Sequence, residues 1–176
     1  TGVDCFVFTS SIAVYGTNQV PMHEALQPRP EDSYGIAKLA VEQELRACRE
    51  MFGLDYVVFR PHNVYGPRQN LGDRYRNVVG IFMNRLLRGE DLIVFGDGEQ
   101  ERAFTHVDDV TPAIARAPGV PAARGEVFNL GADDVITVNR LAELVMQAMD
   151  TRGRVRHVER RLEVRRAFSD HAKLRR

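Results

Sequence analysis

The sequence predicts an α/β protein built around a parallel sheet, and the pattern of apolar residues along its 176 residues supports this class. Short apolar runs bounded by turn residues alternate with segments whose apolar residues recur at helical spacing. The runs at 5–9 and 56–60 are nearly continuous, which is typical of strands buried on both faces of a parallel sheet. The length favours one domain, or one and a fraction.

The first half of the chain is predicted to contain a strand, a long helix, a second strand and a further helix. The first strand covers residues 5–9, and a Pro-rich loop follows at 20–32. Ser33 is predicted to cap a helix that runs to Gly53. A strand at 56–60 is closed by Pro61, and a polar loop at 67–76 leads to a helix at 77–87.

The second half continues the alternation of strands and helices. A strand at 92–95 precedes the tight turn Gly96-Asp97-Gly98. A helix is predicted to follow Asp108 and to run to about Ala117. A strand at 127–131 comes next, and Thr137 is predicted to cap the last helix.

Composition and charge exclude several classes of protein. The chain has 24 basic and 24 acidic residues, so no net charge attracts it to nucleic acid or to a membrane surface. No stretch approaches the roughly 20 apolar residues that span a bilayer. Cys5 and Cys48 are the only cysteines, which predicts reduced, buried thiols and no metal site. We therefore expect a soluble, cytoplasmic protein without a metal.

The segment from Arg152 onward is strongly basic. It holds ten Lys or Arg residues against Glu159, Glu163 and Asp170, an excess of seven positive charges. A solvated basic face is one interpretation. A site for an anionic ligand is the other, because arginine clusters bind phosphates through paired hydrogen bonds.

Tyr34 and Lys38 form a candidate catalytic pair. They are four residues apart in a predicted helix, so they lie on the same face. A nearby ammonium favours the phenolate form and would allow the tyrosine to act as a general base. Taken alone, a YxxxK spacing also describes a surface tyrosine beside a solvated lysine. The Ser-rich end of the first strand, across the Pro-rich loop, gives this pair its context.

Five motifs in order resemble the extended branch of the short-chain dehydrogenase/reductase superfamily, the nucleotide-sugar epimerases and dehydratases. They are FVFTSSIAVYG, SYGIAKLAVEQ, FRPHNVYGPRQ, VFGDGEQERAFTHVDDV and VFNLG. The resemblance implies the C-terminal part of a doubly wound, Rossmann-like sheet with a small α/β substrate-binding domain. It assigns residues 1–66 and 104–131 to the dinucleotide-binding domain, and 67–103 and 132–176 to the substrate domain.

The resemblance also implies a reaction and its cofactor. The expected activity is NAD-dependent 4-epimerisation of a nucleotide sugar of the UDP-glucose/UDP-galactose type, through a transient 4-keto sugar. Ser11 would hydrogen-bond the reacting hydroxyl and Tyr34 would take its proton. Lys38 would grip the nicotinamide ribose. His62 occupies a position near the nicotinamide that is often aromatic in the family, and a structural histidine is the alternative.

Substrate contacts carry over from the same motifs. Asn63, Asn77 and Arg102 match positions on the diphosphate, and Asn77 also begins a helix, where phosphate binds readily. Phe95 is a candidate to pack near the base, with a plain core residue as the alternative. Arg160 matches a phosphate contact and Glu163 a ribose contact, although Arg161-Leu162 replaces the usual Pro-Gly between them. The remaining residues of the implied substrate site are Val78, Val79 and Ile93.

The motifs leave alternatives open. Ser10-Ser11-Ile12-Ala13 lacks the Asp-Glu pair of the dehydratases, which disfavours dehydration. A UDP-sugar decarboxylase shares much of the pattern and is not separated by it. The Gly-rich dinucleotide turn is absent, so this chain alone is expected to bind NAD poorly and to be inactive. A non-catalytic remnant that binds a nucleotide sugar is the other alternative. The resemblance further implies a homodimer through the helix that bears Tyr34.

Overall fold

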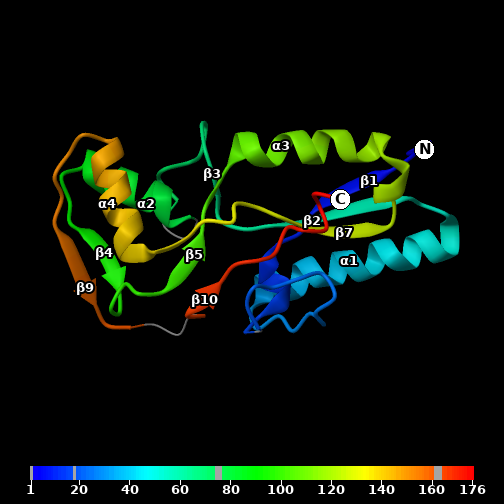
Figure 1. The fold of residues 1–176 in the computed structure, drawn as a ribbon, viewed down its shortest axis with the longest axis horizontal. Coiled ribbons are helices and arrows are strands. Elements are labelled where there is room, and N and C mark those ends of the chain that lie inside the picture. The colour runs from blue at the N-terminus through cyan, green and yellow to red at the C-terminus, as the bar shows by residue number, and fades with distance from the viewer. Residues whose placement is uncertain (1, 18, 74–76, 161–163) are drawn as a thin grey trace.

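The computed structural model describes residues 2–17, 19–73, 77–160 and 164–176 of the chain. Two groups of elements make up the described part, one around a parallel sheet and one around α2, α4 and their neighbouring strands (Figure 1). In chain order the helices and strands are β1 Phe6–Thr9, η1 Ile12–Tyr15, α1 Ser33–Phe52, β2 Tyr56–Pro61, β3 Val64–Tyr65, α2 Val78–Leu87, β4 Leu92–Phe95, β5 Glu101–Ala103, β6 Thr105–His106, α3 Val107–Arg116, η2 Ala117–Gly119, η3 Pro121–Ala123, β7 Glu126–Leu130, β8 Val135–Thr137, α4 Val138–Ala148, β9 Val155–Val158 and β10 Arg166–Ala167.

The first group is a three-stranded parallel sheet of order β1-β2-β7, covered by a helix on each face (Figure 1). Alternate side chains of β2 point to opposite faces. Val58 packs with Leu45 of α1, and Phe59 packs in a separate core cluster with Val110 of α3. The central strand is therefore buried on both sides, which is why its sequence is a continuous apolar run. The prediction of an α/β fold with a parallel sheet is confirmed.

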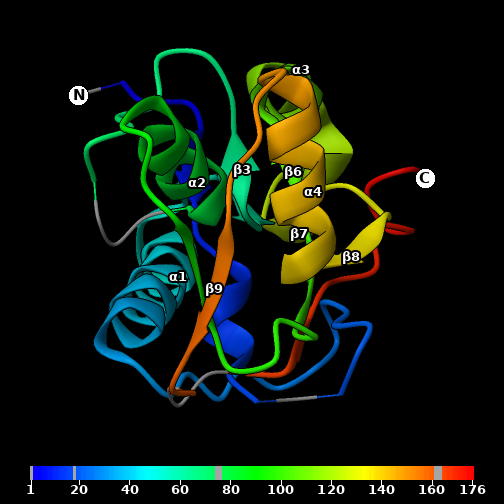
Figure 2. The same cartoon turned by 90° about the vertical axis from the view of Figure 1, so that its left-hand side faces the viewer.

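The second group packs α2 and α4 against the parallel pair β4–β9, as Figure 2 shows face on. Its core contains Phe82, Leu92 and Val94, each at most 1% exposed, together with residues of α4. Shorter strands connect the two groups. β5 pairs in parallel with β10 and antiparallel with β8, and β3 pairs in parallel with β6.

Helix ends differ in detail from the sequence prediction. Asp32, not Ser33, caps α1, because its carboxylate accepts a hydrogen bond from the Gly35 amide at 2.6 Å. The preceding residue offers an equally suitable acceptor, so sequence alone did not separate the two. Thr137 caps α4 as predicted, accepting from the Arg140 amide. Cys5 and Cys48 are free cysteines but only partly buried, so the prediction of buried thiols is wrong.

Candidate functional site

Strand direction gathers the polar residues that follow β1, β2 and β7 at one edge of the sheet. The register pairs Thr9 with Phe59 and Pro61 with Leu130, so the strands end together. Ser11 follows β1, and His62 and Asn63 follow β2. Open parallel sheets bind their ligands at this carboxyl edge. The topology therefore places these predicted site residues where such a fold has its active site.

Tyr34 and Lys38 stand at the start of α1, against the end of β1. The ammonium of Lys38 donates to the Thr9 carbonyl at 2.7 Å and lies 5.6 Å from the centre of the Tyr34 ring. The Tyr34 side chain is exposed, at 54%. Close packing fixes the helix start, since a Cβ on Gly35 would lie 2.7 Å from the Ala13 carbonyl oxygen. The helix thus holds a phenol and a cation together beside the strand that carries Ser11.

A cavity of about 570 Å³ opens at this edge. Ser11 is part of its wall, and its hydroxyl accepts a hydrogen bond from the Ala13 amide at 3.1 Å, which caps η1. Both sequence halves contribute to the lining. The lining residues are Ser11, Ile12, Ala13, Gly16, Thr17, Met22, Glu31, Asp32, His62, Asn63, Arg102, Val164 and Ala167. Four predicted site residues thus share one cavity, and Tyr34 and Lys38 are not among its lining residues.

Asn63 and Arg102 both line this cavity. Asn63 has a φ of 41° and donates from its amide to the Ala103 carbonyl at 2.9 Å. Arg102 donates to the backbone carbonyls of Glu101 at 2.7 Å, Arg165 at 3.1 Å and Val164. The guanidinium therefore already holds the C-terminal segment in place at the edge of the cavity. Binding of a phosphate would require some of these donors to be shared.

His62 is buried beneath the cavity, with 3% of its surface exposed. Its Nδ1 lies 3.1 Å from the Ala103 carbonyl, and its Nε2 lies 3.1 Å from Nε2 of His171. The neighbouring backbone leaves no spare room, because a Cβ on Gly131 would lie 2.1 Å from His62 Nε2. Burial lowers the pKa of His62 from 6.5 to about 4, and the charge of His171 adds to this effect. The ring is therefore neutral at pH 7.

The low pKa of His62 predicts a loss of stability in acid. The folded state binds a proton at His62 less readily than the unfolded chain, whose histidine titrates near 6.5. Stability therefore falls as the pH decreases from 6.5 to about 4, by about 3 kcal/mol in total. The free energy of unfolding, measured by urea titration at each pH, should therefore change clearly less with pH in His62→Phe than in the wild type. Equal pH dependence in the two proteins would contradict the lowered pKa of His62.

A second, smaller cleft brings together two further predicted substrate residues, Phe95 and Arg160. Phe95, at the end of β4, lines it together with Arg160, Gln100 and Arg165. Ile93 lies on the same partly exposed side of β4, while Leu92 and Val94 point into the core. Asp97 lies in this cleft, where the Glu99 amide and nearby arginines lower the pKa of its carboxyl group. An aromatic ring and two arginines thus lie in one cleft.

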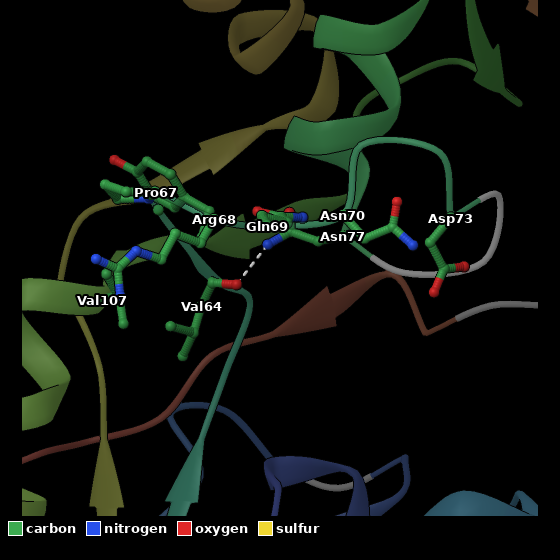
Figure 3. Close-up of a pocket in the computed structure, with 10 residues that line it drawn as sticks. Val64, Pro67, Arg68, Gln69, Asn70, Asp73, Asn77 and Val107 are labelled. Atoms are coloured by element: carbon green, nitrogen blue, oxygen red, sulfur yellow. Dashed lines mark hydrogen bonds between the residues drawn. The ribbon is translucent and has the colours of Figure 1, made fainter.

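Asn77 lies in a third pocket, of about 410 Å³, between the loop after β3 and the start of α2 (Figure 3). Its side-chain oxygen caps α2 by accepting from the Val79 amide, and its side-chain nitrogen donates to the Val64 carbonyl at 2.5 Å. Val78 and Val79 pack in the core of the second group instead, with Val79 only 7% exposed. Val79 also lines an apolar cavity of about 710 Å³ beside α4.

Glu163, predicted to contact the ribose, lies outside the described residues, as do Arg161 and Leu162. Sequence reasoning missed Glu31 and Thr17, which line the cavity and hydrogen-bond to each other at 2.9 Å. Thr17 lies shortly after η1 and Glu31 lies in the Pro-rich loop, so neither residue lies in a segment with periodic apolar spacing. In the described part of the chain, no cluster of His, Cys, Asp or Glu has a geometry suited to a metal ion. None of the described helices is long and apolar enough to cross a membrane.

A parallel sheet covered on both faces, with polar groups at its carboxyl edge, defines a Rossmann-like α/β protein. Residues 1–131 match the model of the NAD dependent epimerase/dehydratase family. The chain therefore belongs to this family.

Individual relatives show which members the chain is similar to. It is 42% identical to a UDP-glucose 4-epimerase of Mycolicibacterium smegmatis, over 74% of this chain and 42% of the relative. It is 32% identical to a UDP-N-acetyl-alpha-D-glucosaminuronate decarboxylase of Bacillus cytotoxicus, over 86% of this chain and 48% of the relative. The structure of a Thermotoga maritima UDP-glucose 4-epimerase with UDP-glucose matches with a TM-score of 0.90 and 38% identity, over 98% of this chain and 56% of that one. The chain thus spans about half the length of these relatives.

Proposed function

We propose that this chain supplies the substrate-binding and proton-transfer residues of an NAD-dependent nucleotide-sugar 4-epimerase of the UDP-glucose/UDP-galactose type. The observation that carries the proposal is the contact of Lys38 with the Thr9 carbonyl, which ties the Tyr34 helix to the strand bearing Ser11. The similarity to UDP-glucose 4-epimerases over most of this chain supports the same activity. Because the relatives are about twice as long, the activity belongs to the chain together with a dinucleotide-binding half.

The residues would divide the proton chemistry between them. Ser11 presents a hydroxyl at the strand end, where it would orient the sugar hydroxyl that reacts. Tyr34 would remove the proton of that hydroxyl and later return it. The Lys38 ammonium, fixed by the Thr9 carbonyl and 5.6 Å from the centre of the Tyr34 ring, would hold the ribose of the nicotinamide. NAD, when bound, supplies a group that accepts and returns a hydride. The neutral ring of His62 would form the floor below the cofactor and sugar.

The substrate would extend from the cavity toward the second cleft. Arg102 and Asn63 in the cavity wall would meet the diphosphate, and Arg160 would add a second cation from the cleft that holds Phe95. Phe95 and Ile93 would face the base. Asn77 would act on the diphosphate from the start of α2, with Val78 and Val79 shaping this region through the core. Glu163 is proposed for the ribose from the family motif alone. In this scheme residues 1–66 and 104–131 form the dinucleotide-binding part, and the remaining residues form the substrate part.

Titration of UDP by isothermal calorimetry tests the proposed site without requiring turnover. Arg102→Ala and Arg160→Ala should each weaken UDP binding by about tenfold or more, because each removes a charge-assisted hydrogen bond. Arg116→Ala, in the last turn of α3 and exposed, removes the same charge elsewhere and should leave the affinity unchanged. Unchanged affinity in both site variants would count against the proposed substrate site. Release of CO2 from a UDP-glucuronate substrate would favour the decarboxylase alternative.

We also propose that the protein forms a cytoplasmic homodimer through α1. The helix carries exposed apolar side chains, with Ile36 at 56%, Val41 at 38% and Met51 at 70% exposed. Apolar surface of this kind on one helix is typical of a subunit interface.

A further inference from the structure

A buried histidine pair lies directly below the cavity and reaches solvent through a carboxylate. The rings of His62 and His171 stack with centroids 5.3 Å apart, and their Nε2 atoms are separated by 3.1 Å. His171 is 2% exposed, and its Nδ1 lies 2.8 Å from a carboxylate oxygen of Asp133. Asp133 is 58% exposed and also pairs with Arg175.

Hydrogen-bond chemistry fixes where the protons lie on this pair. A carbonyl oxygen only accepts, so His62 must carry its proton on Nδ1 to donate to Ala103. A neutral His62 then has a bare Nε2, which can only accept. The 3.1 Å contact with His171 requires one proton between the two Nε2 atoms, since two bare nitrogens would repel each other.

The shared proton is more stable on His171 than on His62. On its other side His171 faces the Asp133 carboxylate, to which it donates from Nδ1, whereas His62 faces only a neutral carbonyl. The hydrogen bond from His171 lowers the pKa of Asp133, which keeps that group ionised at neutral pH. The Ser169 hydroxyl, 3.0 Å from His171 Nε2, can accept the same proton in a shared bond.

We propose that His171 is a positioning residue for the cavity: as an imidazolium held by Asp133, it donates from Nε2 to His62 and locks that ring in its neutral Nδ1–H form. Fixing the His62 ring also affects the wall of the cavity, because His62 and Asn63 both donate to the Ala103 carbonyl. It also joins the strand end at His62 to the C-terminal segment, whose Val164 and Ala167 line the same cavity. The proposal rests on the proposed function only for the ligand that fills the cavity.

Nitrogen NMR of 15N-histidine-labelled protein tests the proton positions without any ligand. The chain has five histidines, which single His→Gln variants assign. At pH 7 we expect His171 to be protonated on both nitrogens and His62 only on Nδ1. Asp133→Asn removes the carboxylate from an exposed site and should leave His171 singly protonated. Asp134→Asn is the matched control, since Asp134 is exposed and lines the apolar cavity beside α4 instead. A neutral His171 in the wild type, or equal responses of the two Asp variants, would overturn the proposal.

Measurement of UDP affinity tests whether the hydrogen bond from His171 to His62 affects ligand binding in the cavity. His171→Leu removes the donor and should weaken UDP binding by about tenfold. In a His62→Phe background, which has no nitrogen to lock, the same substitution should change the affinity by less than about twofold. His171→Gln keeps an N–H donor and should restore most of the affinity. Equal losses in the two backgrounds would overturn the positioning role. Failure of the wild type to bind UDP would reject the proposed function while the NMR result still decides the proton positions.

Discussion

Replacing Tyr34 with phenylalanine should lower kcat for interconversion of UDP-glucose and UDP-galactose by about 10²- to 10⁴-fold, the usual contribution of a general base. The substitution removes only the phenolic oxygen, so no other group near Lys38 can take the sugar proton at the same position. KM should change little, because the proposed substrate contacts lie elsewhere. The assay measures the rate of this interconversion with the chain joined to a dinucleotide-binding half and with NAD present.

A stability measurement separates chemistry from folding in this variant. Tyr34 is 54% exposed, so Tyr34→Phe should leave the free energy of unfolding within about 0.5 kcal/mol of the wild type. Tyr56→Phe is the matched control, because Tyr56 begins β2 at the opposite edge of the same sheet. That control should keep its kcat. Turnover by Tyr34→Phe at the wild-type rate would reject Tyr34 as the base.

The central strand of the main sheet could be predicted from sequence because it is buried on both faces. The expectation that the run at 5–9 is also buried on both faces is wrong, because β1 is only partly covered and Phe6 is 44% exposed. The run at 56–60 is continuous in apolar residues up to Arg60, and β2 occupies Tyr56–Pro61. The short strands gave no such signal. β9 reads Val-Arg-His-Val and β10 only Arg-Ala, and each is defined by pairing with a distant strand, β4 and β5 respectively. Local pattern therefore predicts the core elements but not those formed by tertiary pairing.

The candidate site shows the same difference between residues that local pattern predicts and contacts that depend on the tertiary fold. Ser11 and Asn63 follow strand ends, and strand direction alone brings them to one edge. His171 was missed because its partner His62 is 109 residues away and neither lies in a periodic segment. Arg102 was predicted to face a phosphate, yet its observed partners are backbone carbonyls that sequence does not reveal. Side-chain partnerships across the fold thus required the structure.

A buried ion pair between α1 and β2 carries the largest predicted effect on stability. Arg60 and Glu42 form two hydrogen bonds, Nε to Oε1 at 3.0 Å and Nη2 to Oε2 at 2.5 Å, with side-chain exposures of 5% and 7%. Burial alone would lower the pKa of Arg60, but the interactions with Glu42 and Tyr15 together outweigh burial and raise that pKa. Arg60→Met leaves a buried carboxylate without its partner. We expect the free energy of unfolding to fall by about 3–5 kcal/mol.

Urea unfolding of single and double variants shows whether the loss of stability comes from an unpaired buried charge or from lost packing. The double variant Glu42→Leu/Arg60→Met removes both charges and should recover most of the stability lost by Arg60→Met. Arg140→Ala breaks an exposed pair with Glu143, which is 2.7 Å long, and should cost less than about 1 kcal/mol. No recovery in the double variant would show that the loss comes from packing against Tyr15, whose ring lies 4.7 Å from the Arg60 guanidinium. Glu42 lies on α1, the helix that also carries Tyr34 and Lys38. If the double variant regains its stability but keeps a low kcat, the ion pair also determines where α1 places those two residues.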